Sequence, residues 1–245
     1  IHTVKNSYDI RLFLVIQWGK TGKYLDNGNR MTKCPIAVII MPKRDKEQRQ
    51  MNYEECIELA RPCIGKYCKA CKECNGKACG NQIPGPGAKG IGDTAIRNYD
   101  KWKEIRVNMD TIAENGLVDT SLELFGKKFR YPFFAGPVGA VNLHYGDCLN
   151  DISYNDILVS SCAEFGIAAF TGDGMDSNVM VAATEAIHKA KGLGIPTVKP
   201  WNMETIRKKL ELVHTSEAFA VAMDVDAAGL PFLKNFEPPA GSKTV

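Results

Sequence analysis

Short apolar runs alternate with amphipathic stretches along the second half of the chain. The amphipathic stretches have helical spacing and cover residues 155–166, 177–191 and 202–214. The first ends on Gly166, a typical helix cap, and Asp176 or Ser177 is expected to cap the start of the second. The apolar runs before and between them are predicted strands: YPFFAGPVGA, then residues 167–174, 194–201 and 218–229. Strands that alternate with helices at this spacing form βαβ units, so the pattern predicts a parallel sheet in an α/β fold. The run that opens IAAF is apolar throughout, as expected for a strand covered on both faces.

The predicted strands end in small or polar residues. These ends are Gly136-Pro137, Thr171-Gly172-Asp173, Lys199-Pro200-Trp201 and Asp224-Val225-Asp226. Barrel enzymes place their chemistry at the carboxyl ends of the strands, which favours a (β/α)8 TIM barrel over a doubly wound sheet. A whole barrel takes about 250 residues, so we predict roughly the first four β/α units, preceded by a helical, Cys-rich N-terminal segment.

The chain divides into three predicted segments. Residues 1–50 lack a sustained helical period and form an N-terminal extension that is disordered or non-native. Residues 51–118 hold a helix, a Cys-rich loop and a second helix over 93–112. Residues 119–245 form the N-terminal half of the barrel and open with a hairpin that turns at Gly126-Lys127.

Composition and charge exclude several classes of function. The chain is 44% hydrophobic and 24% charged, with a formal net charge of +3, so we expect neither a nucleic-acid partner nor binding to an anionic membrane. The apolar runs 13–17 and 35–42 are shorter than the ~20 residues that span a bilayer. Neither run has the flanks of a secretory signal. We therefore expect a cytoplasmic protein whose thiols stay reduced.

Five of the nine cysteines lie within residues 63–79, spaced C-x4-C-x2-C-x2-C-x4-C. The inner set approaches a ferredoxin-type iron–sulfur run, with one extra residue and no following proline. Its C-x2-C pairs would equally suit zinc. The predicted ligands are Cys68, Cys71, Cys74 and Cys79, although a loop without metal is an open alternative. Among the other cysteines, Cys162 is expected to face the core of its helix.

The strand ends carry a resemblance to a known family. Residues 83 to about 235 resemble the N-terminal half of the FMN-dependent α-hydroxy-acid dehydrogenases and oxidases, such as glycolate and lactate oxidase. They are most similar to a Cys-rich bacterial branch of α-hydroxy-acid-oxidizing proteins. The matching order is Gly87-Ala88, a helix, VDTSLELFGKKFRYP and AGPVGAVNLHYGD. This resemblance implies an FMN-binding TIM barrel that transfers hydride from a small hydroxylated substrate to FMN.

The resemblance also implies which residues contact the flavin. Gly136, Pro137 and Val138 match a turn whose backbone lies against the ring. Thr171 matches a hydroxyl position on the second strand, and Lys199 and Trp201 match a Gln-x-Tyr pair on the third. Asp224 stands near the ring in place of a threonine, and Asp226 matches a supporting aspartate. The implied cofactor-binding set is Gly136, Pro137, Val138, Thr171, Lys199, Trp201 and Asp224.

Several family residues are replaced in this chain. The tryptophan of the second strand falls at Asp173, and the arginine expected after Asp226 is missing. A substrate carboxylate needs cationic or phenolic donors, and Lys199 is the one that this half offers. Lys199 could therefore stabilise either a substrate carboxylate or an anionic reduced flavin.

The catalytic base is expected beyond Val245, because the family carries it in the second half of the barrel. Lys199 and Asp226 would support it, while His188 and His214 lie on predicted outer helices and His144 lies in the first strand's loop. We expect this chain alone to be catalytically silent and to associate through unpaired edge strands, and the full-length protein to be a homo-oligomer. Alternatives are an isomerase of the type-two isopentenyl diphosphate kind, a metal or electron-transfer module, and an inactive fragment.

Overall fold

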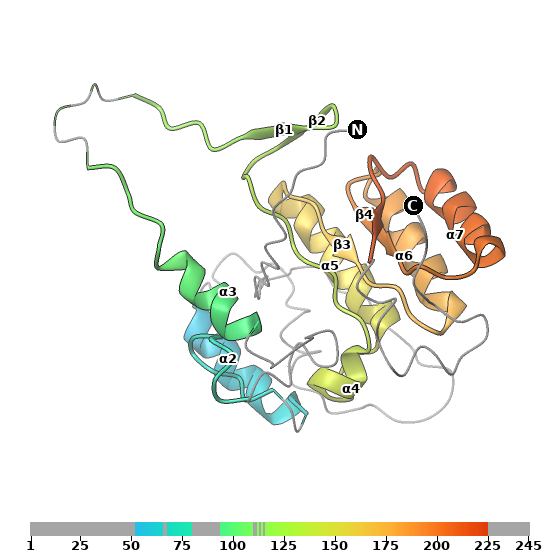
Figure 1. Ribbon diagram of the computed structural model, residues 1–245, viewed down its shortest axis with the longest axis horizontal. Helices are drawn as coiled ribbons and strands as arrows, with labels where there is room; N and C mark the ends of the chain where they lie inside the picture. Colours follow the sequence, from blue (N-terminus) through green and yellow to red (C-terminus); the bar gives the residue numbers. More distant parts are fainter. Residues whose placement is uncertain are drawn as a thin grey trace, which may run out of the picture.

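The computed structural model describes residues 52–65, 68–79, 94–109, 112, 114 and 116–224. Its helices are α2 (Tyr53–Ala60), α3 (Thr94–Trp102), α4 (Val141–Tyr145), α5 (Asp151–Phe165), α6 (Ser177–Lys189) and α7 (Met203–Thr215), with a 3-10 turn η1 (Arg61–Cys63). Its strands are β1 (Leu122–Leu124), β2 (Lys127–Phe129), β3 (Phe170–Thr171), β4 (Ile195–Val198) and β5 (Ala222–Met223) (Figure 1). Within these ranges, no helix is both long and apolar enough to cross a membrane.

The predicted parallel sheet is present. Strands β3, β4 and β5 lie side by side in sequence order and run parallel. A further parallel bridge joins Ala135 to Ala169, which places the run around Ala135 beside β3. Neighbours in the sequence are thus neighbours in the sheet, as consecutive strands of a barrel are. The described residues show these adjacent units but not a closed barrel.

Helices α5, α6 and α7 connect these strands and begin at well-formed caps. Helix α5 starts at Asp151, four residues before the predicted start, because Asn150 and Ser153 form a capping box. It ends at Gly166, whose left-handed φ of 90° confirms the predicted glycine cap. The side chain of Asp176 accepts from the N–H of Asn178 and caps α6, as predicted.

The core lies between the sheet and these helices. All four residues of β4 are buried, which fits a strand covered on both faces. One cluster packs the outer side of the first strands against α5 and α6: Ala135, Leu158, Val159, Cys162, Ile167, Ala169, Ala186 and Ile187. A second packs β4 against α6 and α7: Met180, Val198, Trp201, Ile206 and Val213. The prediction that Cys162 faces the core is confirmed, since it is fully buried.

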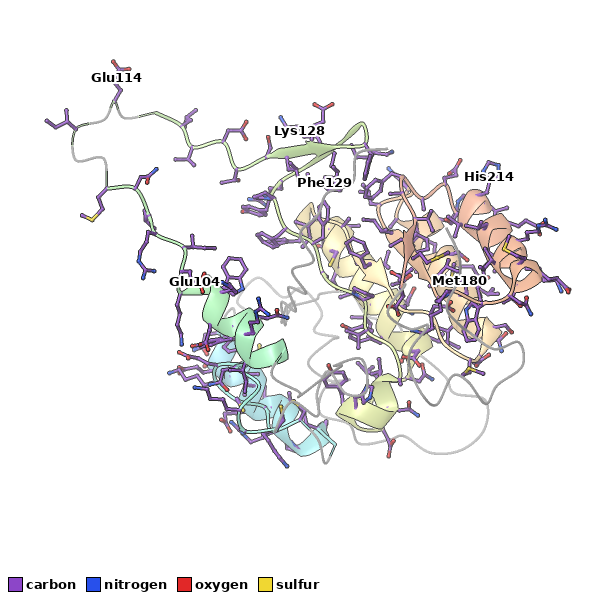
Figure 2. All side chains as sticks on the ribbon, viewed as in Figure 1. Glu104, Glu114, Lys128, Phe129, Met180 and His214 are labelled. Carbon is purple, nitrogen blue, oxygen red and sulfur yellow. The ribbon has the colours of Figure 1, made fainter. Side chains whose placement is uncertain are left out.

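The hairpin of β1 and β2 precedes the sheet. Its turn lies at Phe125 and Gly126, one residue earlier than predicted, and both have positive φ, at 48° and 73°. Two such residues form the turn that matches strand twist in a two-residue hairpin. Phe129 is 2% exposed and packs edge-on against Phe134 at 4.7 Å, whereas Lys128 points away from the body (Figure 2).

The N-terminal elements lie to one side of the sheet and its helices, with α2 beside α3 (Figure 1). The prediction of one helix over 93–112 is wrong, because α3 ends at Trp102. Beyond it Ile105 and Met109 are 64% and 89% exposed, and an amphipathic pattern without a packing partner does not sustain a helix. The predictions for residues 1–50, for Gly87-Ala88 and for Asp226 fall outside the described residues.

Candidate functional site

The carboxyl ends of the parallel strands meet at one edge of the sheet, as the fold requires. The N–H of Asp224 donates to the carbonyl of Val198 at 2.9 Å, which joins the ends of β4 and β5. The N–H of Lys199 donates to the Asp173 carboxylate, also at 2.9 Å, which joins the ends of β4 and β3. The chain segments that hold the predicted site residues are therefore adjacent.

The loop after the first strand, at Val138 and Gly139, is in close backbone contact with Gly172 at the end of β3. A Cβ added at Gly172 would lie 2.3 Å from the carbonyl oxygen of Val138, closer than any side chain allows. Gly172 therefore permits a backbone approach that brings the predicted turn Gly136–Val138 to this edge. The contact explains why a glycine stands immediately after Thr171.

The sheet register separates the predicted side chains into two groups. Ala169 packs in the helix-facing core, and Thr171, two residues later, lies on the same face of its strand. Thr171 is paired with Pro196, which shares its face with Val198, a residue that packs on α6 and α7. The register thus places the Thr171 side chain on the helix-facing side of the sheet. Its hydroxyl is fully buried and has no hydrogen-bond partner.

The opposite face of the sheet, here named the inner face, carries a different set of polar groups. Thr197 precedes Lys199 by two residues and is paired with Ala222, which in turn precedes Asp224 by two residues. The side chains of Thr197, Lys199 and Asp224 therefore lie on the same face of the sheet. The ammonium of Lys199 forms an ion pair with Asp224 at 2.7 Å, with side chains 17% and 31% exposed. The Thr197 hydroxyl is buried without a partner. An orphaned buried hydroxyl costs stability, and a polar ligand on this face would satisfy it.

Trp201 belongs to the helix side rather than to the inner face. Its indole is 3% exposed and packs with Val198 and Ile206, and its N–H donates to Asp173 at 2.7 Å. The single donor of the indole is therefore engaged by the Asp173 carboxylate. The backbone N–H of Trp201 donates to the carbonyl of Lys199 at 2.8 Å, and this turn carries the ring to the helix side.

Asp173 and Lys209 form a buried ion pair that sequence reasoning missed. Their Oδ1 and Nζ atoms are 2.6 Å apart, with side chains 0% and 9% exposed. The signal for Lys209 was present, since residues 206, 209 and 213 share one face of α7 and all three are buried. Thr197 was missed because it lies within an otherwise apolar run.

The remaining predicted residues have simple environments. His188 and His214 lie on α6 and α7 and are exposed, as predicted for outer helices. His144 lies on α4, just after the loop of the first strand. The described cysteines are all free thiols, and Cys56 and Cys148 are partly buried.

The cysteine loop brings several of its thiols near one another. Burial, followed by the neighbouring thiols of Cys68, Cys79 and Cys71, raises the pKa of Cys74. The N–H of Ala70 donates to the sulfur of Cys68 at 3.5 Å. Within the described residues, however, no three Cys, His, Asp or Glu side chains are grouped so that they could hold a metal ion. The structure thus gives no support to the predicted iron–sulfur cluster or zinc ion.

Comparison with known proteins identifies one family. Residues 86–234, more than half of the chain, match the family described as FMN-dependent dehydrogenase. No curated protein and no solved structure gives a significant match. The matched range includes all the strand ends described above.

Proposed function

The chain belongs to the FMN-dependent dehydrogenase family, a family of TIM-barrel flavoenzymes, and we propose that the inner face of its strand ends binds FMN for the oxidation of a small α-hydroxy acid. The observation that carries this proposal is the buried Thr197 hydroxyl, which lacks a partner and lies on the face of the Lys199–Asp224 ion pair. A neutral hydroxyl beside a cation is a suitable lining for the polar edge of a flavin.

The residues of the inner face fit this cofactor. Thr197 would supply a hydrogen bond to a polar atom of the ring, and Lys199 would offset negative charge that develops on the ring. Asp224 holds the Lys199 ammonium in one place. The close backbone contact between Val138 and Gly172 means that backbone groups, rather than side chains, would face the cofactor at the adjacent strand ends. When bound, FMN supplies the acceptor of a hydride from the substrate.

The ion pair also bears on the choice of substrate. Lys199 lies on the inner face, and its ammonium is already bonded to Asp224. A substrate carboxylate that binds Lys199 must therefore compete with the Asp224 carboxylate. Removal of the Asp224 charge, as in D224N, should strengthen the binding of an acid and leave the binding of a neutral diol unchanged.

Absorption titrations test both parts of the proposal. The purified chain is titrated with FMN, and the FMN-loaded protein is then titrated with glycolate or with the matching diol, ethylene glycol. We expect glycolate to perturb the flavin spectrum, the diol to have little effect, and D224N to lower the Kd for glycolate severalfold. Failure to bind FMN would contradict the whole proposal. Equal binding of acid and diol, or weaker glycolate binding by D224N, would contradict the proposed substrate class alone.

A further inference from the structure

The carboxylate of Asp173 collects three hydrogen bonds behind the inner face. Its Oδ2 accepts from the backbone N–H of Lys199 at 2.9 Å and from the Trp201 indole at 2.7 Å. Its Oδ1 accepts from the Lys209 ammonium at 2.6 Å. These partners lie 26, 28 and 36 residues away along the chain, so the carboxylate ties β3, β4 and α7 together.

The environment of this carboxylate makes it a rigid support. The Asp173 side chain is 0% exposed and that of Lys209 is 9% exposed, so water competes little for either group. Buried charges of this kind persist where a partner of opposite charge and further hydrogen bonds satisfy them. The Lys209 ammonium also lies 5.6 Å from the centre of the Trp201 ring, which further restricts the indole.

We propose that Asp173 is a positioning residue for the flavin site: it fixes the backbone of Lys199 from the helix side and so aims the Lys199 ammonium across the inner face. Neither Asp173 nor Lys209 lies on the inner face, so they act through Lys199. β4 ends at Val198, and the bond from the N–H of Lys199 to Asp173 holds the backbone at the next residue. This inference rests on the proposed flavin site for its effect on binding.

The contribution of Asp173 as an acceptor can be separated from its charge. In K209M with D173N, the amide oxygen can occupy the position of Oδ2 and still accept from Lys199 and Trp201. In K209M with D173L, a side chain of similar size offers no acceptor. Both double variants lose the buried ion pair, so they differ in the two hydrogen bonds that support Lys199 and Trp201.

The two double variants are compared for the Kd of FMN and, with Trp18 and Trp102 replaced by phenylalanine, for acrylamide quenching of Trp201 fluorescence. We expect the leucine variant to bind FMN about tenfold more weakly than the asparagine variant and to show stronger quenching of Trp201. The single variant D176N, in the same loop and on an exposed cap, should match the wild-type chain in both measurements.

Each result decides the inference. Equal quenching in the two double variants would overturn the positioning of Trp201, and equal FMN affinity would overturn the positioning of Lys199. A wild-type chain that binds no FMN would defeat the proposed function. In that case the quenching experiment alone would still decide whether Asp173 orders the turn that follows β4.

Discussion

The cysteine region at residues 52–79 and the strand-end region at residues 135–224 organise their polar groups in opposite ways. The cysteine region contains most of the described cysteines, and its ion pairs are exposed, as between Lys72 and Glu54, whose side chains are 77% and 64% exposed. The strand-end region also has an exposed pair, Lys208–Glu204, but its Asp173–Lys209 pair is almost fully buried and joins residues 36 apart.

The difference shows why residue type and spacing are incomplete guides to a site. Thiols close together in sequence are close in space, but they do not meet as metal ligands in the described residues. The polar groups at the strand ends come from distant parts of the chain, and the fold makes them converge. Convergence of buried groups from separate elements is the stronger indication of function.

The largest expected effect follows from breaking the buried pair. In K209M the Asp173 carboxylate keeps its burial and loses its cation, so the free energy of unfolding should fall by about 3–5 kcal/mol. Urea denaturation measures this change. The matched control is K208M, because Lys208 is the next residue along α7 and pairs with Glu204 on the surface. K208M should unfold at the wild-type midpoint, and similar losses in both variants would contradict the assigned burial.

A smaller effect is expected from adding a methyl group at the strand-end contact. In G172A the new Cβ must displace the Val138 carbonyl, so the free energy of unfolding should fall by about 1–3 kcal/mol. At Gly174, two residues on, the nearest atom to a new Cβ is a Val179 methyl carbon at 3.8 Å, which is ordinary contact. Thermal melts of both variants measure the difference, and G174A should be nearly neutral. If G172A melted at the wild-type temperature, the loop would not be held against Gly172.

The buried thiol of Cys162 predicts a dependence on alkaline pH. Burial raises the pKa of Cys162 from 9.0 to about 12, so the unfolded chain loses this proton before the folded protein does. The stability due to this group is complete below pH 9 and is lost as the pH rises toward 12, by up to about 1.4 kcal/mol per pH unit. In urea titrations at several pH values, the free energy of unfolding should fall less steeply with rising pH in C162A than in the wild-type protein. Equal slopes for wild type and C162A would contradict the assignment.

The smallest effect is expected in the cysteine region. In E54Q the exposed contact to Lys72 loses its charge, and the midpoint of urea denaturation should not change, because solvent screens such pairs. Iodoacetamide at neutral pH should also leave the fully buried Cys162 unmodified in the folded protein. A large loss of stability in E54Q would break the contrast between the two regions.

Much of the fold was predictable, because it depends on local signals. Apolar periodicity placed the three helices that cover the sheet, and Gly166 and Asp176 marked two of their ends as predicted. The length of α3 was overestimated, since the pattern through Ile105 and Met109 continues without a surface to pack on. An apolar periodicity shows that a segment could form an amphipathic helix, but it does not show whether the fold provides a surface on which that helix can pack.

The site was predictable only in outline. The strand ends were correctly identified as adjacent, but the side of the sheet on which each side chain lies depends on register, which a single sequence does not define. The predicted set grouped Thr171 and Trp201 with Lys199, and the structure adds that the side chains of Thr171 and Trp201 lie on the helix side. The pairing of Asp173 with Lys209 was missed because charged residues are usually exposed, and their burial becomes evident only when β3 and α7 are brought together.

The binding of FMN by two threonine variants tests the central claim most directly. Thr171 and Thr197 are both buried, both lack a hydrogen-bond partner, and lie on opposite faces of adjacent strands. Flavin fluorescence titrations of T197V and T171V measure the Kd of FMN when the same substitution, threonine to valine, is made on either face of the sheet. We expect T197V to raise the Kd of FMN about five- to tenfold and T171V to leave it near the wild-type value. A loss of affinity in T171V with none in T197V would contradict the assignment of the flavin to the inner face.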